Sequence, residues 1–245
     1  STPVPIISNV QKITVDSLQN RVISDIRTKY NAAKSRSNTG EDYTGEPEVF
    51  QCKDVTLKSE VYTDALQLVN FYRELAGLPS DITIDESLKN ACYITAKYSS
   101  RTGRISHDIN EIFKDTCDFS DNWNLIKNTL QKSSLANGRE HVLDLLLGQI
   151  KDEGSNNEGE VGHRRWLLYP YLKSISVGFY PLSYHAMPGY KLQYPPSAVF
   201  GLNYGTYSIS EYTNNNYTAW PPAGPFPIEL LPTSWSGYYN KFQKS

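Results

Sequence analysis

The sequence lacks the features that mark several large classes of protein. Its 24 Lys and Arg residues nearly balance 26 Asp and Glu residues, and a net charge of −2 gives no basic field that would attract nucleic acid or an anionic membrane. No apolar run approaches the roughly 20 residues that a transmembrane helix needs. A Gly-x-Ser-x-Gly nucleophile elbow is also missing. We therefore expect no nucleic-acid partner, no transmembrane segment and no hydrolase of the elbow type.

Cysteine and methionine are scarce. Three cysteines, Cys52, Cys92 and Cys117, have spacings that match no zinc ribbon, and they allow either one disulfide with one free thiol or three buried thiols. If a disulfide forms, we expect Cys92–Cys117, because both residues flank the loop of Ser106 and His107. The chain begins with Ser1 and holds one Met, so we expect a processed protein that has lost a signal peptide and is secreted or held at the cell surface.

Apolar residues at helical spacing predict the elements of the first two thirds of the chain. Gly77 and Pro79 end the second of these helices, Asp85 caps the third, and Gly103 ends it. We expect helices from Val15 to about 31–34, over Tyr62–Ala76, from Asp85 to Gly103, around Trp123–Leu130 and over Val142–Ile150. No strong strand is expected before residue 174.

Glycine, proline and tyrosine become frequent after Ser174, and helical spacing disappears. We expect strands over Ser174–Tyr180, Ser197–Leu202, Tyr207–Tyr212 and Tyr217–Trp220. The segment Trp220–Pro227 is too rich in proline for a central strand and is expected to wrap the surface. Helices followed by strands predict an α+β domain over residues 60–245, with residues 1–59 as an N-terminal arm and helical extension.

Two histidines are the main candidates for chemistry. The stretch Glu158–Tyr180 predicts a loop that delivers His163 to a cleft, a helical turn at Arg164–Leu168 and a strand, while His107 lies in the loop after the third helix. Two imidazoles that converge would make half of a tetrahedral zinc site. The remaining ligands would have to come from nearby carboxylates: Glu111, Asp152, Glu153, Glu158 and Glu160. The alternative is that each histidine binds backbone and only holds its loop in place.

Four segments, taken in order, resemble the bacterial type of the CAP superfamily, whose SCP-like domains include cysteine-rich secretory proteins and plant pathogenesis-related proteins. Two helices open the resemblance: the segment 68–73 with Gly77-Leu78-Pro79, and the segment from Ala91 to Ser106-His107. The segment Gly162-His163-Arg164-Arg165-Trp166 is similar to the family's Gly-His motif, and Ile175–Phe179 looks like the strand that follows it. The resemblance covers residues 60–220.

The resemblance implies a secreted α-β-α sandwich with a large cleft. In the family, two histidines and two acidic residues line this cleft, which in some members holds a divalent metal such as zinc. His107 and His163 fall on the two histidine positions, which makes them the expected metal ligands. The family's Gly-Glu-Asn segment is replaced here by Lys132-Ser133-Ser134, so that glutamate is missing. The second acid is Glu153 or Asp152, or is replaced by Gln149.

These observations lead to three hypotheses. The first is a ligand-binding module that recognises a lipid, a glycan or a protein in a cleft lined by His107, His163, Glu153 and Glu160. The second is a metal-assisted hydrolase, either a peptidase or a cell-wall enzyme, that uses one histidine as a base. The third is a structural or adhesion module whose cleft has lost its role.

Overall fold

The structure is a computed structural model, and it describes residues 23–35, 41–76, 78–109, 112, 117–152, 162–169 and 171–204. The strands expected over 207–212 and 217–220, the surface wrap over 220–227 and the start of the first expected helix lie outside the described residues. None of the described helices combines the length and the apolar character that crossing a membrane requires.

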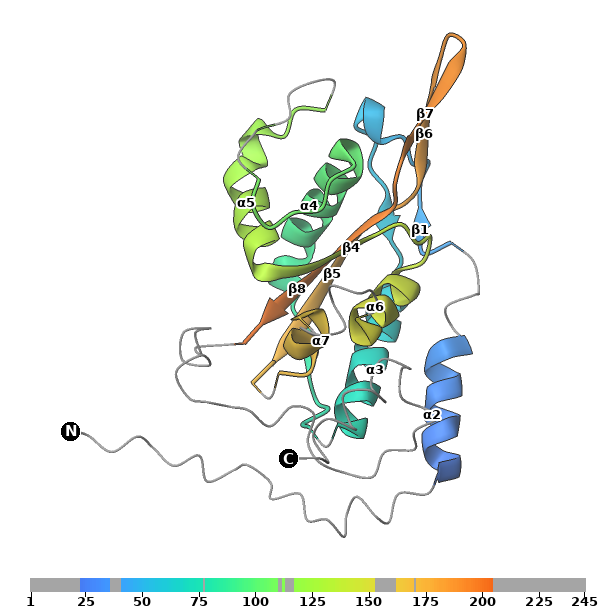
Figure 1. Cartoon of the computed structure of the whole chain (residues 1–245), viewed down its shortest axis with the longest axis vertical. Helices are drawn as coiled ribbons and strands as arrows, with labels where there is room; N and C mark the ends of the chain where they lie inside the picture. Colours follow the sequence, from blue (N-terminus) through green and yellow to red (C-terminus); the bar gives the residue numbers. More distant parts are fainter. Residues whose placement is uncertain are drawn as a thin grey trace, which may run out of the picture.

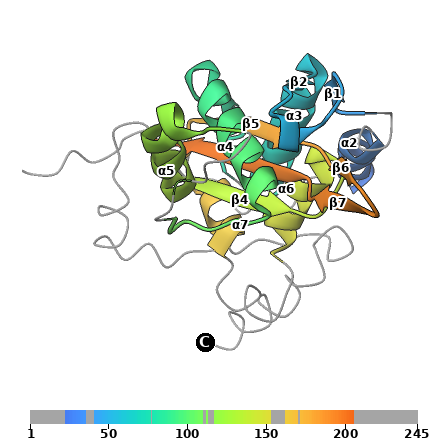
Figure 2. The ribbon, with the colours of Figure 1, turned by 90° about the horizontal axis from the view of Figure 1, so that it is seen from above.

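A four-stranded mixed sheet forms the centre of the described part of the chain. Its strand order is β3 (Thr83–Ile84), β5 (Ser174–Tyr180), β8 (Ser197–Asn203) and β4 (Ser133–Asn137). Strand β5 pairs in parallel with β3 and antiparallel with β8, which in turn pairs antiparallel with β4. Figure 2 shows β5, β8 and β4 side by side. All seven residues of β5 are buried, as expected for a central strand covered on both faces.

Helices cover both faces of this sheet. Helices α4 (Lys89–Thr102) and α5 (Trp123–Lys132) lie over one face. Helices α3 (Ser59–Leu75), α6 (Val142–Lys151) and α7 (Gly162–Leu167) lie over the other, as Figure 1 shows. Helix α2 (Ile23–Ser35) packs against α3 through an ion pair between Lys29 and Glu74 and a ring contact between Tyr30 and Phe71. The fold is therefore an α-β-α sandwich, as the family resemblance implies, and it confirms the α+β class that the sequence pattern predicts.

The period of two along each strand divides the core into two clusters. On β5, Ile175, Val177 and Phe179 pack with α3, α6 and α7, whereas Tyr180 faces the layer of α4 and α5. Strand β8 divides in the same way, because Phe200 joins the first cluster and Val199 the second. The alternation that predicts a strand from the sequence thus also assigns its residues to the two helical layers.

Helix α4 lies unusually close to β5 and β8. A Cβ atom added to Gly178 of β5 would lie 2.0 Å from the backbone carbonyl carbon of Cys92, and one added to Gly201 of β8 would lie 2.7 Å from the Cys92 Sγ. At both positions, only glycine leaves enough room between the strand and helix α4. Gly178 is the small residue within the predicted alternation of β5, and its role is this close approach.

The disulfide joins Cys52 to Cys117, with a Cα–Cα distance of 4.9 Å, and Cys92 is a buried free thiol. The expected pair Cys92–Cys117 is therefore wrong. Cys92 is held inside the sandwich between α4 and the glycines of β5 and β8, where burial raises its pKa to about 12. Cys52 instead follows the 3-10 helix η2 (Val49–Gln51). This segment also contacts the sheet, because the Tyr180 hydroxyl donates to the Lys53 carbonyl at 2.7 Å.

Most predicted helices and two predicted strands are confirmed. Asp85 caps the short 3-10 helix η3 (Glu86–Leu88) that leads into α4, and Gly103 ends α4 in the left-handed conformation. The sequence predicts no strong strand before residue 174, but two strands of the central sheet, β3 and β4, come before it in the chain. A small hairpin of β1 (Tyr43–Thr44) and β2 (Thr56–Leu57) also precedes it. Strands β1, β2 and β3 have two residues each, too few for periodicity to reveal them. Strand β4 has five residues, but its sequence Ser-Ser-Leu-Ala-Asn does not alternate between polar and apolar residues.

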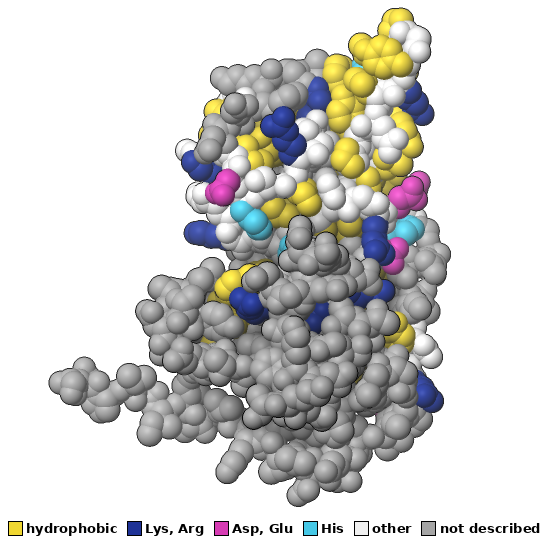
Figure 3. Space-filling view, viewed as in Figure 1, with side chains coloured by type: hydrophobic (Ala, Val, Ile, Leu, Met, Phe, Trp, Pro, Cys, Tyr) yellow, Lys and Arg dark blue, Asp and Glu magenta, His cyan; other side chains and the backbone are white. Residues whose placement is uncertain are grey.

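A second hairpin, of β6 (Ser183–Met187) and β7 (Tyr190–Tyr194), was also not predicted. It projects from one end of the domain in Figure 1, and hydrophobic side chains cover much of it in Figure 3. Tyr184 and Tyr190 are exposed, and the Lys191 ammonium lies 3.9 Å from the centre of the Tyr184 ring. His185, in the middle of β6, stacks its ring on Phe50 of η2.

Candidate functional site

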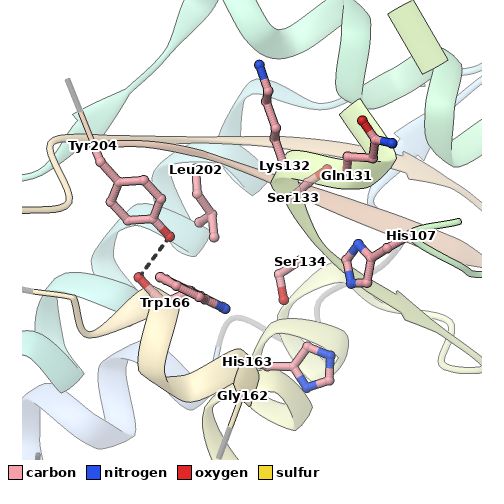
Figure 4. A pocket seen from close by; sticks show the side chains of 10 residues that line it. All are labelled: His107, Gln131, Lys132, Ser133, Ser134, Gly162, His163, Trp166, Leu202 and Tyr204. Carbon is pink, nitrogen blue, oxygen red and sulfur yellow. Dashed lines mark hydrogen bonds between the residues drawn. The ribbon is translucent and has the colours of Figure 1, made fainter. Parts of the chain in front are cut away.

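One pocket of about 320 Å³ lies where four segments of the chain meet. These segments are the loop after α4, the junction of α5 with β4, helix α7 and the end of β8. His107 and His163 both line the pocket, although 55 residues separate them in the sequence, and Figure 4 shows their rings beside the same space. The other lining residues are 131–134, Gly162, Trp166, Leu202 and Tyr204.

His163 lies in the first turn of α7 and is oriented by a buried carboxylate. Its Nδ1 is 2.8 Å from the Oδ1 of Asp152, whose side chain is 0% exposed. Because a carboxylate only accepts hydrogen bonds, Nδ1 carries the proton in the neutral ring and Nε2 keeps its lone pair. The residue sits one helical turn before Trp166, which places both side chains on the pocket.

Asp152 can reach His163 because of the way α6 ends. Asp152 takes the left-handed conformation, with φ of 53°, directly after the last residue of α6. Its Oδ2 accepts from the backbone N–H of Arg164 at 3.2 Å, and the Arg164 Nε donates to the Ile150 carbonyl at 2.6 Å. These bonds tie the start of α7 to the end of α6 and fix the direction of the imidazole.

A second arginine supports the other end of α7. The buried guanidinium of Arg73 donates from Nη1 to the carbonyls of Leu167 at 3.2 Å and Tyr169 at 2.8 Å, and from Nε to Pro79 at 2.7 Å. It satisfies carbonyl groups that the end of a helix leaves without partners. Burial lowers the pKa of Arg73 to about 10, so it stays charged at neutral pH.

His107 is held in the same way by a different partner. Its Nδ1 contacts the backbone carbonyl of Leu130 at the end of α5. A carbonyl oxygen only accepts, so Nδ1 is again the protonated nitrogen and Nε2 the lone-pair nitrogen. This bond is the one that a loop-holding role predicts, but the ring also lines the pocket. Neither Nε2 has a hydrogen bond with another residue in the described ranges.

Ser134 occupies the region where the family resemblance places a glutamate. Its hydroxyl contacts the Oε1 of Gln149, and the Nε2 of Gln149 donates to the Leu135 carbonyl at 3.2 Å. The second bond fixes the orientation of the amide, so the Ser134 hydroxyl donates to Gln149 and keeps its lone pairs for another partner. Asp152 and Gln149 are both candidates for the position of the family's second acidic residue. In the structure, Asp152 binds His163 and Gln149 binds Ser134.

The expected site residues are only partly described. His107 and His163 meet on one pocket, whereas Glu153 and Glu160, together with Glu111 and Glu158, lie outside the described residues. Sequence reasoning missed Gln131, Leu202 and Tyr204. Gln131 lies near the end of α5, Leu202 in β8 and Tyr204 directly after β8. No local pattern singles them out, because they meet the histidines only when these elements pack together.

The residues that the structure describes do not complete a zinc site. Within these residues, no group of three His, Cys, Asp or Glu side chains could hold a metal ion. The two Nε2 atoms would supply at most two of the four ligands that a structural zinc ion takes. Both imidazoles do have the outer hydrogen bonds on Nδ1 that metal-bound histidines have. Coordination of a metal by His107 and His163 therefore stays a prediction.

The comparisons with known proteins give one result. The model of the family described as CAP, the cysteine-rich secretory protein family, matches residues 66–190, or 125 of the 245 residues. The matched region includes both pocket histidines, helix α4 and strand β5. Searches of curated proteins and of solved structures return no match. With half of its length matched and an α-β-α sandwich as its fold, the chain belongs to the CAP family of cysteine-rich secretory proteins.

Proposed function

We propose that this chain is a CAP-domain protein that acts outside the cell, secreted or at the cell surface, as a ligand-binding module. Its binding site is the pocket between His107 and His163. The observation that carries the proposal is the orientation of the two imidazoles. Each ring is fixed through Nδ1 by a partner outside the pocket, and each presents Nε2 as an acceptor. Holding two side chains in this way reduces the entropy that binding a ligand would cost.

The disulfide supports an extracellular location. Disulfides persist in oxidising compartments and are rare in reducing ones. Cys52–Cys117 closes a loop of 65 residues across the layer that contains α4. We also propose that the protein is bacterial, because its Gly-His-Arg-Arg segment is similar to the bacterial form of the family's motif.

The proposal is tested by nuclear magnetic resonance of the histidine rings. Protein labelled with ¹⁵N is titrated at neutral pH with glucose, sodium acetate and zinc chloride in separate samples, at millimolar concentrations suited to small ligands. We expect at least one probe to shift the Nε2 resonances of both His107 and His163. The His185 ring, which stacks on Phe50, is the internal reference and should not move. If all three probes leave both pocket rings unchanged, the pocket is not a binding site for these classes and the proposal fails.

The pair of Asp152 and His163 favours a metal-assisted hydrolase as the second candidate. A carboxylate that orients an imidazole through Nδ1 leaves the one lone pair of Nε2 either to act as a general base or to hold a metal, and in this candidate one histidine would serve as the base. Ser134 is not set up as its nucleophile, because its hydroxyl donates to Gln149. Release of peptides from casein and of muropeptides from purified peptidoglycan tests this candidate, with and without zinc chloride. Turnover lost in His163→Ala and kept in His141→Ala would support it, and no turnover by wild type would remove it.

A calorimetric titration with zinc chloride on wild type and on His163→Ala addresses the metal directly. Equal heats in the two proteins would remove His163 as a ligand. His141→Ala is a suitable control, because His141 precedes α6 at the end of that helix opposite to Asp152.

A further inference from the structure

The ligand class can be narrowed from the hydrogen-bonding character of the pocket, an inference that rests on the proposed function. We infer that the pocket takes a neutral polyhydroxylated ligand, such as one sugar ring. Its hydroxyl groups donate to the Nε2 atoms of His107 and His163, and one face of the ring packs on Trp166.

The two histidines and Ser134 contribute acceptors to the pocket, whereas its side-chain donors are the indole N–H of Trp166 and the exposed side chains of Gln131 and Lys132. Both Nε2 atoms carry lone pairs in the neutral rings, because their Nδ1 atoms donate to Leu130 and Asp152. Ser134 donates its only hydroxyl hydrogen to Gln149, so it too faces a ligand as an acceptor. The pocket therefore suits a partner that donates to these three acceptors and can also accept from the donors beside them, as hydroxyl groups do.

This character disfavours an anion. A carboxylate group offers only lone pairs at neutral pH, and it would meet the lone pairs of both imidazoles when the rings are neutral. The described lining residues do include a cation, Lys132, but this side chain is exposed, and Figure 4 shows it directed away from the two histidines. A hydroxyl group, in contrast, donates to an imidazole nitrogen and accepts a further bond, so a polyol satisfies the site without a change in charge.

The other side of the pocket is aromatic and apolar. Trp166, Leu202 and Tyr204 line it, and the rings of Trp166 and Tyr204 lie 6.1 Å apart. The Tyr204 hydroxyl donates to the Trp166 carbonyl at 3.4 Å, and burial raises the pKa of Tyr204, so this tyrosine stays neutral. Figure 4 shows Trp166 between Tyr204 and the histidines.

A sugar ring has both properties that this pocket selects. Its C–H groups form an apolar face suited to an indole, and its hydroxyl groups point outward from the ring edge. A volume of about 320 Å³ lies at the lower end of ordinary ligand pockets, which suits a single ring rather than a long chain. The pocket therefore fits a single sugar ring, such as the terminal unit of a glycan, better than an extended lipid chain.

The test is a binding panel on the full chain at neutral pH with a chelator present. The probes are glucose, N-acetylglucosamine and glycerol as neutral polyols, with acetate, phosphate and methylammonium as charged alternatives. Binding is followed by ligand-observed magnetic resonance and by shifts of the two pocket rings. We expect a sugar to bind wild type and to bind His163→Phe about fivefold more weakly, since one hydrogen bond is worth about 1 kcal/mol. Trp166→Ala should lose a similar factor, and His141→Ala should bind like wild type.

The outcomes separate this inference from the proposed function. Binding of acetate, phosphate or methylammonium without any polyol would overturn the inference and leave the pocket as a binding site. Shifts with zinc chloride only, in samples without chelator, would do the same in favour of a metal. Sugar binding that is unchanged in both His163→Phe and Trp166→Ala would place the sugar elsewhere and overturn the inference. Circular dichroism of each variant establishes that it is folded, and a variant that fails this check is replaced by His107→Phe.

Discussion

Replacing Gly178 by alanine places a methyl group inside the contact between α4 and β5. The added Cβ would lie 2.0 Å from the Cys92 carbonyl carbon, 2.1 Å from its oxygen and 2.4 Å from the backbone nitrogen of Tyr93. An ordinary van der Waals contact begins at about 3.4 Å. All three neighbours are backbone atoms of a buried helix, so no side chain can turn aside to make room.

The size of the effect follows from these distances. To restore an ordinary contact, α4 must move away from the strand by about 1.4 Å, the difference between 3.4 and 2.0 Å. That movement opens the packing of the cluster that includes Cys92 and Ala96. Overpacking in a core typically costs 1–3 kcal/mol, and a clash with backbone belongs at the upper end, about 3 kcal/mol. For a chain of this size we expect a melting temperature lower by roughly 6–12 °C.

Differential scanning calorimetry measures this change, and Gly148 supplies the matched control. Gly148 lies in α6, where an added Cβ meets nothing within 4 Å. Gly148→Ala should therefore raise the free energy of unfolding by up to about 1 kcal/mol, because alanine favours the helix more than glycine does. A Gly178→Ala protein that melts within 2 °C of wild type, a change of about 1 kcal/mol or less, would refute the close packing of α4 on β5.

Gly201 provides an internal check on the mechanism. Its added Cβ would meet the Cys92 Sγ at 2.7 Å, which is a side-chain atom. Cys92→Ala should therefore recover about 1 kcal/mol of the stability lost in Gly201→Ala and none of that lost in Gly178→Ala. If Cys92→Ala restores the same stability to Gly178→Ala as to Gly201→Ala, the clash at Gly178 is with the Cys92 side chain and not with the backbone, and this explanation is wrong.

Three further predictions concern the rest of the described fold. Reducing the Cys52–Cys117 disulfide, which spans 65 residues, should lower the free energy of unfolding by about 4 kcal/mol in urea titrations, and an unchanged midpoint would contradict the pairing. Hydrogen bonds, chiefly from Ser87 and also from Asn203, hold the pKa of Asp85 below its usual range, so its contribution to stability is full above the unfolded-state pKa and is lost as the pH falls through the lower folded value. In a plot of the free energy of unfolding against pH, Asp85→Asn should therefore lose less stability at acidic pH than wild type does. An equal loss in both proteins would exclude the Asp85 carboxylate as the cause. Arg73→Leu leaves backbone carbonyls without donors and should cost about 3 kcal/mol by calorimetry, whereas an unchanged melting temperature would mean that water replaces the guanidinium.

Local signals in the sequence determined the helices and the central strand. Regular spacing of apolar residues identified α3, α4 and α6, and a capping aspartate with a terminal glycine placed the limits of the α4 region. Alternation identified β5 with its bounds of Ser174–Tyr180. Each of these signals acts within one element, where the period of the backbone directly controls which side chains become buried.

Contacts between distant segments were decided only by the tertiary structure. In the sequence, Cys92 is the expected partner of Cys117, because both flank the loop of His107. The close packing of α4 on two glycines instead encloses Cys92, and Cys52 forms the disulfide. The two histidines could be singled out by residue type. The tautomer of each ring could not be predicted, because the hydrogen-bond partner of Nδ1 lies at the end of another helix. This partner is at the end of α5 for His107 and at the end of α6 for His163. The chemistry of the pocket depends on these hydrogen bonds, and a linear pattern does not encode them because they form only when the layers pack.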